Sequence, residues 1–175
     1  MKALRSNGLS YARQLIALGM EILPLLRLNR FKVFLLSRAG VSISPDTVIS
    51  STFKVVGCGR VKVGGPSFIG HRVTFYTSSA DISVGRGVDI GPEVSIITGG
   101  HEIGNETRRA GKGSNEPVTI SDGCWIGARV LILGGVTIGA GTVVAAGAVV
   151  TDNLDGGSLY AGVPARKVKS LDGNY

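Results

Sequence analysis

The sequence predicts a three-sided parallel β-helix of about five coils, preceded by an α-helical segment. The main observation is a six-residue period: from Ile120 to Val150 an aliphatic residue returns at every sixth position. Within these hexads the second residue tends to be Gly or Ala, and the fifth is small or β-branched. β-Branched residues suit short extended segments, and glycines permit sharp bends and close approach of backbones. A fixed short repeat of this kind indicates a stack whose aliphatic residues form one continuous core.

Three earlier triplets continue this register towards the N-terminus. They are Ile43, Ile49 and Val55; Val63, Ile69 and Phe75; and Val84, Ile90 and Ile96. With three hexads to a coil, the chain supplies about five coils, more than such a stack needs to bury its own core. The register is interrupted by a small insertion after Phe75 and by a large one between Ile96 and Ile120. The large insertion predicts a polar external loop over residues 99–117, and long excursions from a rigid scaffold are often functional.

Residues 1–40 are expected to form two helices ahead of the first coil. Four apolar residues fall on one face of the first helix: Tyr11, Leu15, Leu18 and Ile22. Pro24 is expected to open the second helix, which runs to Arg38. Residues 1–38 contain seven basic residues and one acidic residue, so this segment holds six of the seven net positive charges of the chain.

This basic helical segment leaves two hypotheses open. In the first, the helices cap the open end of the β-helix or pack on a neighbouring subunit. In the second, they rest as an amphipathic hairpin on an anionic membrane surface. Glu21 and Arg27 interrupt any apolar span of transmembrane length. A nucleic-acid partner is not expected, because the bases alternate with aliphatic residues rather than with stacking aromatics.

Several motifs in the second half of the chain resemble those of a known family. They are the hexads, a looped-out segment that begins at His101, the run CWIGARVLILGGVTIGAGTVVAAGAVV and the closing AGVPAR. Together they resemble the hexapeptide-repeat acyltransferases, and among these the sugar O-acetyltransferases of the galactoside, maltose and nodulation-factor type. The resemblance covers roughly residues 60–170. It implies that the coils are left-handed and that three copies assemble into a homotrimer with the active sites at subunit boundaries.

The expected organisation therefore has three parts. A basic amphipathic helical segment occupies residues 1–40, and a left-handed parallel β-helix with the external loop 99–117 occupies residues 41–157. A C-terminal tail follows over residues 158–175.

His101 is the expected catalytic residue. It stands where a regular coil turns into the long loop, and a histidine can both take up and return a proton near neutral pH. By resemblance, His101 deprotonates an acceptor hydroxyl, which attacks the acetyl carbonyl of acetyl-CoA without a covalent acyl-enzyme. The resemblance assigns the backbone donor to the developing oxyanion to Ala128.

The resemblance also assigns the contacts of both substrates. Acetyl-CoA, the acyl donor, is expected at five positions: Ala128, Ala146, Thr151, Arg166 and Lys169. The two bases among them suit the nucleotide phosphates. Trp125 and His71 are the expected acceptor contacts, and His71 stands where galactoside-type members have an Asn, so a different acceptor geometry is expected. No metal ion is expected.

The predicted function is O-acetylation of a sugar or glycan-pathway hydroxyl by acetyl-CoA. The predicted location is the cytoplasm, with peripheral contact to the inner face of the cytoplasmic membrane through residues 1–38. An N-acetyltransferase, a serine or antibiotic acetyltransferase of the same fold, and a non-catalytic β-helix scaffold remain as alternatives. A carbonic anhydrase of this fold is excluded, because it gathers three histidines around zinc and this chain has only His71 and His101.

Overall fold

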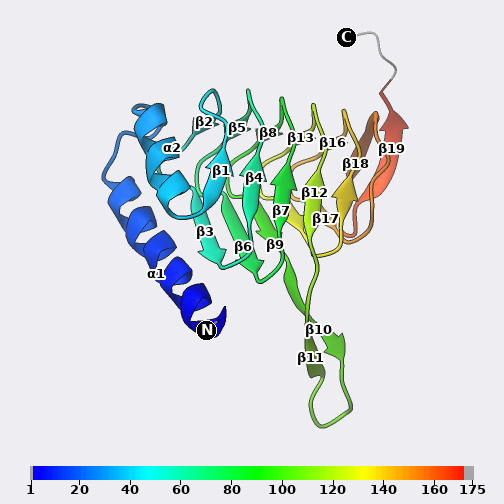
Figure 1. Ribbon diagram of the computed structural model, residues 1–175. Helices are drawn as coiled ribbons and strands as arrows, with labels where there is room; N and C mark the ends of the chain where they lie inside the picture. Colours follow the sequence, from blue (N-terminus) through cyan, green and yellow to red (C-terminus); the bar gives the residue numbers. More distant parts are fainter. Residues whose placement is uncertain (1, 172–175) are drawn as a thin grey trace.

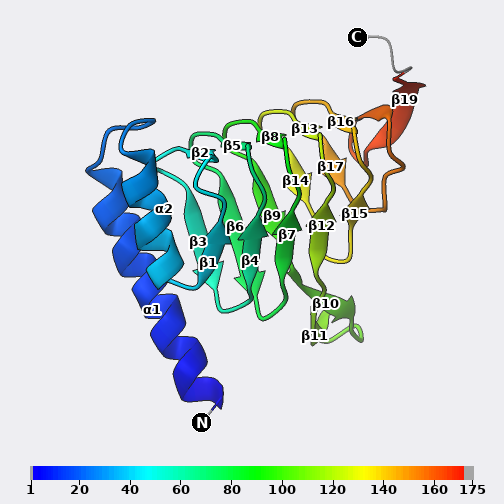
Figure 2. The same cartoon turned by 45° about the horizontal axis from the view of Figure 1, so that its top comes forward.

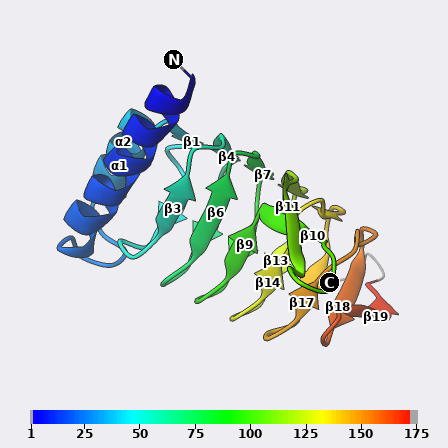
Figure 3. The same cartoon turned by 90° about the horizontal axis from the view of Figure 1, so that it is seen from below.

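The computed structural model describes residues 2–171, and it confirms a parallel β-helix of about five coils with two helices at its N-terminal end (Figure 1). The strands of successive coils pair in parallel and form three sheets. The first sheet contains β1 (Val41–Ile43), β4 (Val61–Val63), β7 (Ile82–Val84), β12 (Val118–Ile120) and β15 (Thr137–Ile138). The second contains β2 (Val48–Ile49), β5 (Phe68–Ile69), β8 (Asp89–Ile90), β13 (Trp125–Ile126), β16 (Val143–Val144), β18 (Ser158–Ala161) and β19 (Arg166–Ser170). The third contains β3 (Lys54–Gly57), β6 (Thr74–Ser78), β9 (Ser95–Ile97), β14 (Leu131–Ile132) and β17 (Val149–Val150), which Figure 3 shows side by side.

The hexad positions form the core of the stack. In the second sheet Ile69 pairs with Ile90, Ile90 with Ile126, and Ile126 with Val144. All four of these side chains are fully buried. Each aliphatic side chain therefore lies above an equivalent one in the next coil, at the ~4.8 Å spacing of paired strands.

The helices close the N-terminal end of the stack, but the predicted start of the second helix is wrong. Helix α1 spans Lys2–Glu21, and α2 spans Asn29–Arg38 rather than beginning at Pro24. The segment between them forms turns because its backbone bonds to the first coil: the Leu25 carbonyl accepts from the Ser51 N–H at 2.9 Å. The Asn29 side chain then fixes the start of α2 by accepting from the Ile49 N–H at 2.9 Å.

The other end of the stack is closed by the C-terminal strands. β18 pairs in parallel with β16, so residues 158–161 of the segment expected as a tail continue the second sheet. β19 then folds back antiparallel along β18. Figure 2 shows the helices at one end of the stack and these two strands at the other.

Candidate functional site

The long insertion folds into a hairpin that projects from the stack (Figure 1). Its strands are β10 (Gly99–Ile103) and β11 (Ala110–Asn115), paired antiparallel. The hairpin leaves the coil directly after β9, at the edge of the third sheet where its strands end. His101 is therefore held on a paired strand at a fixed place beside the stack.

One ring nitrogen of His101 is tied to the hairpin. Its Nδ1 lies 3.0 Å from the carbonyl oxygen of Gly111. A carbonyl oxygen only accepts, so in the neutral ring Nδ1 carries the proton and Nε2 keeps the lone pair. The hairpin thereby selects the tautomer in which Nε2 can act as a base.

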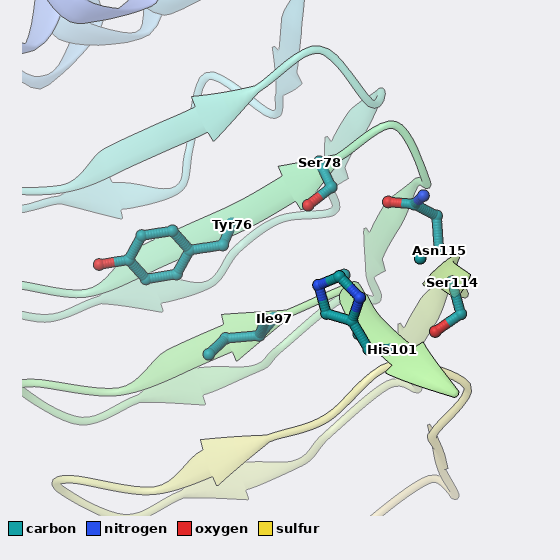
Figure 4. Close-up of a pocket in the computed structure, with 9 residues that line it drawn as sticks. Tyr76, Ser78, Ile97, His101, Ser114 and Asn115 are labelled. Carbon is teal, nitrogen blue, oxygen red and sulfur yellow. The ribbon is translucent and has the colours of Figure 1, made fainter. Parts of the chain in front are cut away.

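A pocket of about 470 Å³ opens beside this imidazole. The hairpin contributes Ser114 and Asn115, and the sheet contributes Tyr76, Ser78 and Ile97. Figure 4 shows the His101 ring directed from the hairpin towards the sheet strands that carry these residues. Three glycines complete the lining and keep the space open: Gly99, Gly100 and Gly113. The pocket combines an aromatic ring with hydroxyl and amide groups, which suits a ligand rich in hydroxyl groups.

A second groove, also of about 470 Å³, runs along the opposite edge of the third sheet, where its strands begin. It contains three of the predicted site residues: Trp125, Ala128 and Ala146. Small residues are required between the coils here, because a Cβ on Gly127 would lie 2.6 Å from the Ala146 backbone nitrogen. The N–H groups of Ala128 and Ala146 donate to no acceptor within residues 2–171. They remain free to bind an acyl donor or an oxyanion.

The base and this groove are far apart in one chain. His101 follows the end of β9, whereas Ala128 precedes the start of β14, the next strand of the third sheet. The five-residue strand β6 shows the width between the two edges, about 13 Å at 3.3 Å per residue. A single chain therefore does not bring His101 to the groove.

Comparison with known proteins agrees with this architecture. A family model for the bacterial transferase hexapeptide (six repeats) matches residues 117–152. The "Putative colanic acid biosynthesis acetyltransferase WcaF" of Escherichia coli is 30% identical over 138 residues, which cover 79% of this chain and 74% of that protein. The chain belongs to the hexapeptide-repeat acetyltransferases.

The galactoside O-acetyltransferases among the relatives confirm the predicted resemblance to the sugar O-acetyltransferase group of this family. The galactoside O-acetyltransferase of Escherichia coli is 36% identical over 91 residues, 52% of this chain and 45% of that protein. The chain spans about half the length of several curated relatives, this one included. A hexapeptide-repeat acetyltransferase from Vibrio cholerae, solved in complex with acetyl coenzyme A, is 28% identical with a TM-score of 0.78, over 95% of this chain and 88% of that one.

The remaining residues expected from the family resemblance lie in two other places. Thr151 and Arg166 both contact Asp152, with the Arg166 guanidinium 3.2 Å from its carboxylate. Lys169 lies on β19 opposite Leu159, which lines the groove. Of these three residues, Lys169 is therefore the one whose strand partner lines the groove.

His71 does not share the pocket of His101. Its Nδ1 lies 3.0 Å from the Thr52 hydroxyl, in a separate pocket of about 480 Å³ that also contains Lys54 and Arg72. It stands on the edge of the third sheet that carries Ala128, two coils nearer the N-terminus. In one chain it cannot contact the same acceptor group as His101.

A column of charged residues along the groove edge was not predicted from the sequence. Arg72, Glu93 and Arg129 occupy equivalent corners of successive coils with φ between 56° and 60°, where Gly147 stands in the next coil. The Glu93 carboxylate lies 2.7 Å from Arg129 and 3.8 Å from Arg72. The hydrogen bond from Arg129 lowers the pKa of Glu93. The sequence does contain a signal for this column, because it places charged residues at a repeat position whose positive φ otherwise favours glycine.

Tyr76 and Ser78 were also not predicted as site residues. They point outward from β6, and only the hairpin beside them makes them part of a pocket. Among residues 2–171, no group of three or more His, Cys, Asp or Glu side chains is placed to hold a metal ion.

Proposed function

We propose that this protein is an O-acetyltransferase that transfers the acetyl group of acetyl-CoA to a hydroxyl of a sugar or glycan-pathway acceptor. The observation that carries the proposal is His101, whose Nδ1 is held by the Gly111 carbonyl so that Nε2 is available as a base beside an open pocket. The free N–H groups in the groove at Ala128 and Ala146 support binding of the acyl donor there.

The proposed reaction is a direct transfer. His101 Nε2 takes the proton of the acceptor hydroxyl while its oxygen attacks the acetyl carbonyl carbon. The N–H of Ala128 donates to the oxyanion of the tetrahedral intermediate. The carbon–sulfur bond then breaks, and the imidazolium returns its proton to the departing thiolate, which gives an acetyl ester and CoA.

We place each active site between two copies of the chain. The separation of His101 from the groove supports this placement, because a second copy must supply one of the two parts. We propose a cyclic assembly in which the hairpin of each copy meets the groove of the next copy. Its size is taken from the family resemblance, which implies a homotrimer.

A sugar acceptor is supported by the lining of the His101 pocket. Ser78, Ser114 and Asn115 offer hydrogen-bonding groups to hydroxyls, and Tyr76 offers an aromatic ring. The names of the galactoside and colanic acid relatives point to the same class of acceptor.

Replacing His101 with Ala tests the chemistry. Transfer, followed by release of free CoA thiol in a screen of sugar acceptors, should fall by about 10²–10⁴-fold. Binding of CoA in a thermal-shift assay should persist, because His101 lies outside the groove. Near-normal turnover of His101→Ala would refute the mechanism, and a wild-type protein that neither binds CoA nor releases thiol would leave a scaffold function.

A mixing experiment tests the shared site. His101→Ala lacks the base, and Ala128→Arg is designed to block the groove, so each variant alone should be inactive. When the two are co-expressed, a site is competent where the base of one variant meets the groove of the other, which happens at about a quarter of the sites in random assemblies. No recovery of activity in folded mixed assemblies would place the site within one chain.

A further inference from the structure

The helices carry an apolar face that the β-helix does not cover. Helix α1 packs on the coil through Arg13, Ile16, Met20 and the following Leu23. The four residues predicted to share one face, by contrast, point outward and are 63–86% exposed: Tyr11, Leu15, Leu18 and Ile22. The helices cap the coil with their other side, so capping leaves this apolar face exposed.

Two buried cations fix this orientation. The Arg13 guanidinium, 3% exposed, donates to the carbonyls of Ala39, Gly57 and Gly59 at 3.1, 2.6 and 3.0 Å. The fully buried Lys32 ammonium donates to the carbonyls of Leu25 and Ile49. Burial lowers the pKa of both groups. Turning α1 to bury its apolar face would deprive Arg13 of its acceptors, so the face is held outward.

The turn after α1 and α2 itself also expose large apolar side chains. Five more large side chains there are 48–56% exposed: Leu25, Leu26, Leu28, Phe31 and Phe34. All nine exposed residues lie within residues 11–34, on the two neighbouring helices and the turn between them, and a concentration of exposed apolar side chains of this kind marks an interaction site. Figures 1 and 2 show that α1 and α2 lie together at the N-terminal end of the stack.

The charges beside this face are positive. Arg27, Arg30 and Arg38 are exposed next to it, whereas Glu21, the one acidic residue of residues 1–38, is paired with Lys54 at 2.6 Å. For residues 1–7, which include Lys2 and Arg5, the structure describes no side-chain positions. A second copy of this face would bring arginines against arginines without an acidic partner, which disfavours self-association. Negatively charged headgroups above an apolar layer complement both properties.

We propose that the outward face of residues 11–38 docks on the surface of an anionic lipid bilayer. The apolar side chains enter the headgroup boundary, and Arg27, Arg30 and Arg38 contact the lipid phosphates. No helix within residues 2–171 is long and apolar enough to cross a membrane. Docking through the helices would not cover the hairpin with His101, which projects from the side of the stack (Figure 1).

Vesicle sedimentation with the full-length protein tests this proposal without any substrate, so its outcome is separate from that of the acetyltransferase proposal. The protein should sediment with phosphatidylglycerol-containing vesicles at ~0.1 M salt and be largely released at ~1 M salt. Pure phosphatidylcholine vesicles should bind it more weakly, by about fivefold for each arginine that contacts lipid. Equal binding to both kinds of vesicle, or no binding to either, would overturn the proposal.

Substitutions on the exposed face sharpen the test. Leu15→Glu together with Leu18→Glu should lower the partition constant at least about 100-fold, because burying one leucine is worth at least about tenfold. Ile103→Glu is the matched control, since Ile103 is 90% exposed on the hairpin, and it should bind vesicles as the wild type does. Unchanged vesicle binding by the double variant would contradict the assigned face. A smaller assembly of the double variant in light scattering would instead make this face an interface between copies and would also overturn the proposal.

Discussion

Replacing Arg13 with Met should detach the helical cap. Arg13 is the hydrogen-bond donor to the carbonyls of Ala39, Gly57 and Gly59, and Met fills a similar length without a donor. Each carbonyl left buried without a partner costs about 1–3 kcal/mol. Part of this cost is offset because the buried cation, whose pKa is lowered by desolvation, is removed. We expect a net loss of about 3 kcal/mol, which corresponds to a fall in Tm of about 6–12 °C for a chain of this size.

Two measurements check this expectation. Thermal unfolding followed by circular dichroism gives the change in Tm, and limited trypsin digestion shows whether cleavage concentrates in residues 1–38, as loss of the cap predicts. Arg27→Met is the matched control, because Arg27 is exposed and its replacement should change stability by no more than about 0.5 kcal/mol. If Arg13→Met were as stable and as protease-resistant as Arg27→Met, the buried guanidinium would not be what holds the helices on the coil.

Three further outcomes are expected. Ile126→Ala should lower the free energy of unfolding in urea by about 2–5 kcal/mol, because its side chain is fully buried in the aliphatic column; a loss below about 1 kcal/mol would contradict that packing. Gly59→Ala should fail to form the normal coil, because a Cβ there would lie 1.9 Å from the Ala80 carbonyl oxygen; a variant with wild-type circular dichroism and Tm would show that the coils can separate. Burial raises the pKa of the Cys124 thiol, so iodoacetamide should label it after denaturation but not in the folded protein at mildly alkaline pH, and rapid labelling detected by mass spectrometry would argue against its buried position.

The repeat made the architecture predictable from the sequence. Because the core residue recurs at every sixth position, one alignment of hexads assigns residues such as Ile90 and Ile126 to the buried column, where the structure places them. The same register also marked residues 99–117 as an external segment, and the structure forms the β10–β11 hairpin within it. Local spacing was sufficient because each coil contacts only its neighbours.

The packing of the helices was not predictable in the same way. An amphipathic pattern identifies two faces of α1 but does not say which one meets the coil. The open end of the first coil presents carbonyls at Gly57 and Gly59 that need donors, and Arg13 supplies them from the more polar face. The start of α2 was misplaced for a related reason, because the Leu25 carbonyl is used by the first coil rather than by a helix.

The arrangement of the candidate site was predictable from the sequence only in part. Trp125, Ala128 and Ala146 share one groove because the ungapped hexads that connect them place them on neighbouring coils. His71 and His101 lie at different edges of the third sheet. Whether they can contact a common acceptor depends on how copies of the chain assemble. The spacing of residues along one chain does not predict that contact.

The closure of both ends of the stack has a consequence for the length of the assembly. Every coil offers its strand edges as a template for another coil, and an uncovered edge of this kind can add a strand from another molecule without limit. Here α1 and α2 cover the first coil, and at the other end β19 lies along β18 while Gly162 and Ala165 bond to β17. A further coil could pair with the first or the last coil only by displacing these segments. Loss of either end would expose strand edges to which the coils of other molecules can add, and so would favour linear fibres.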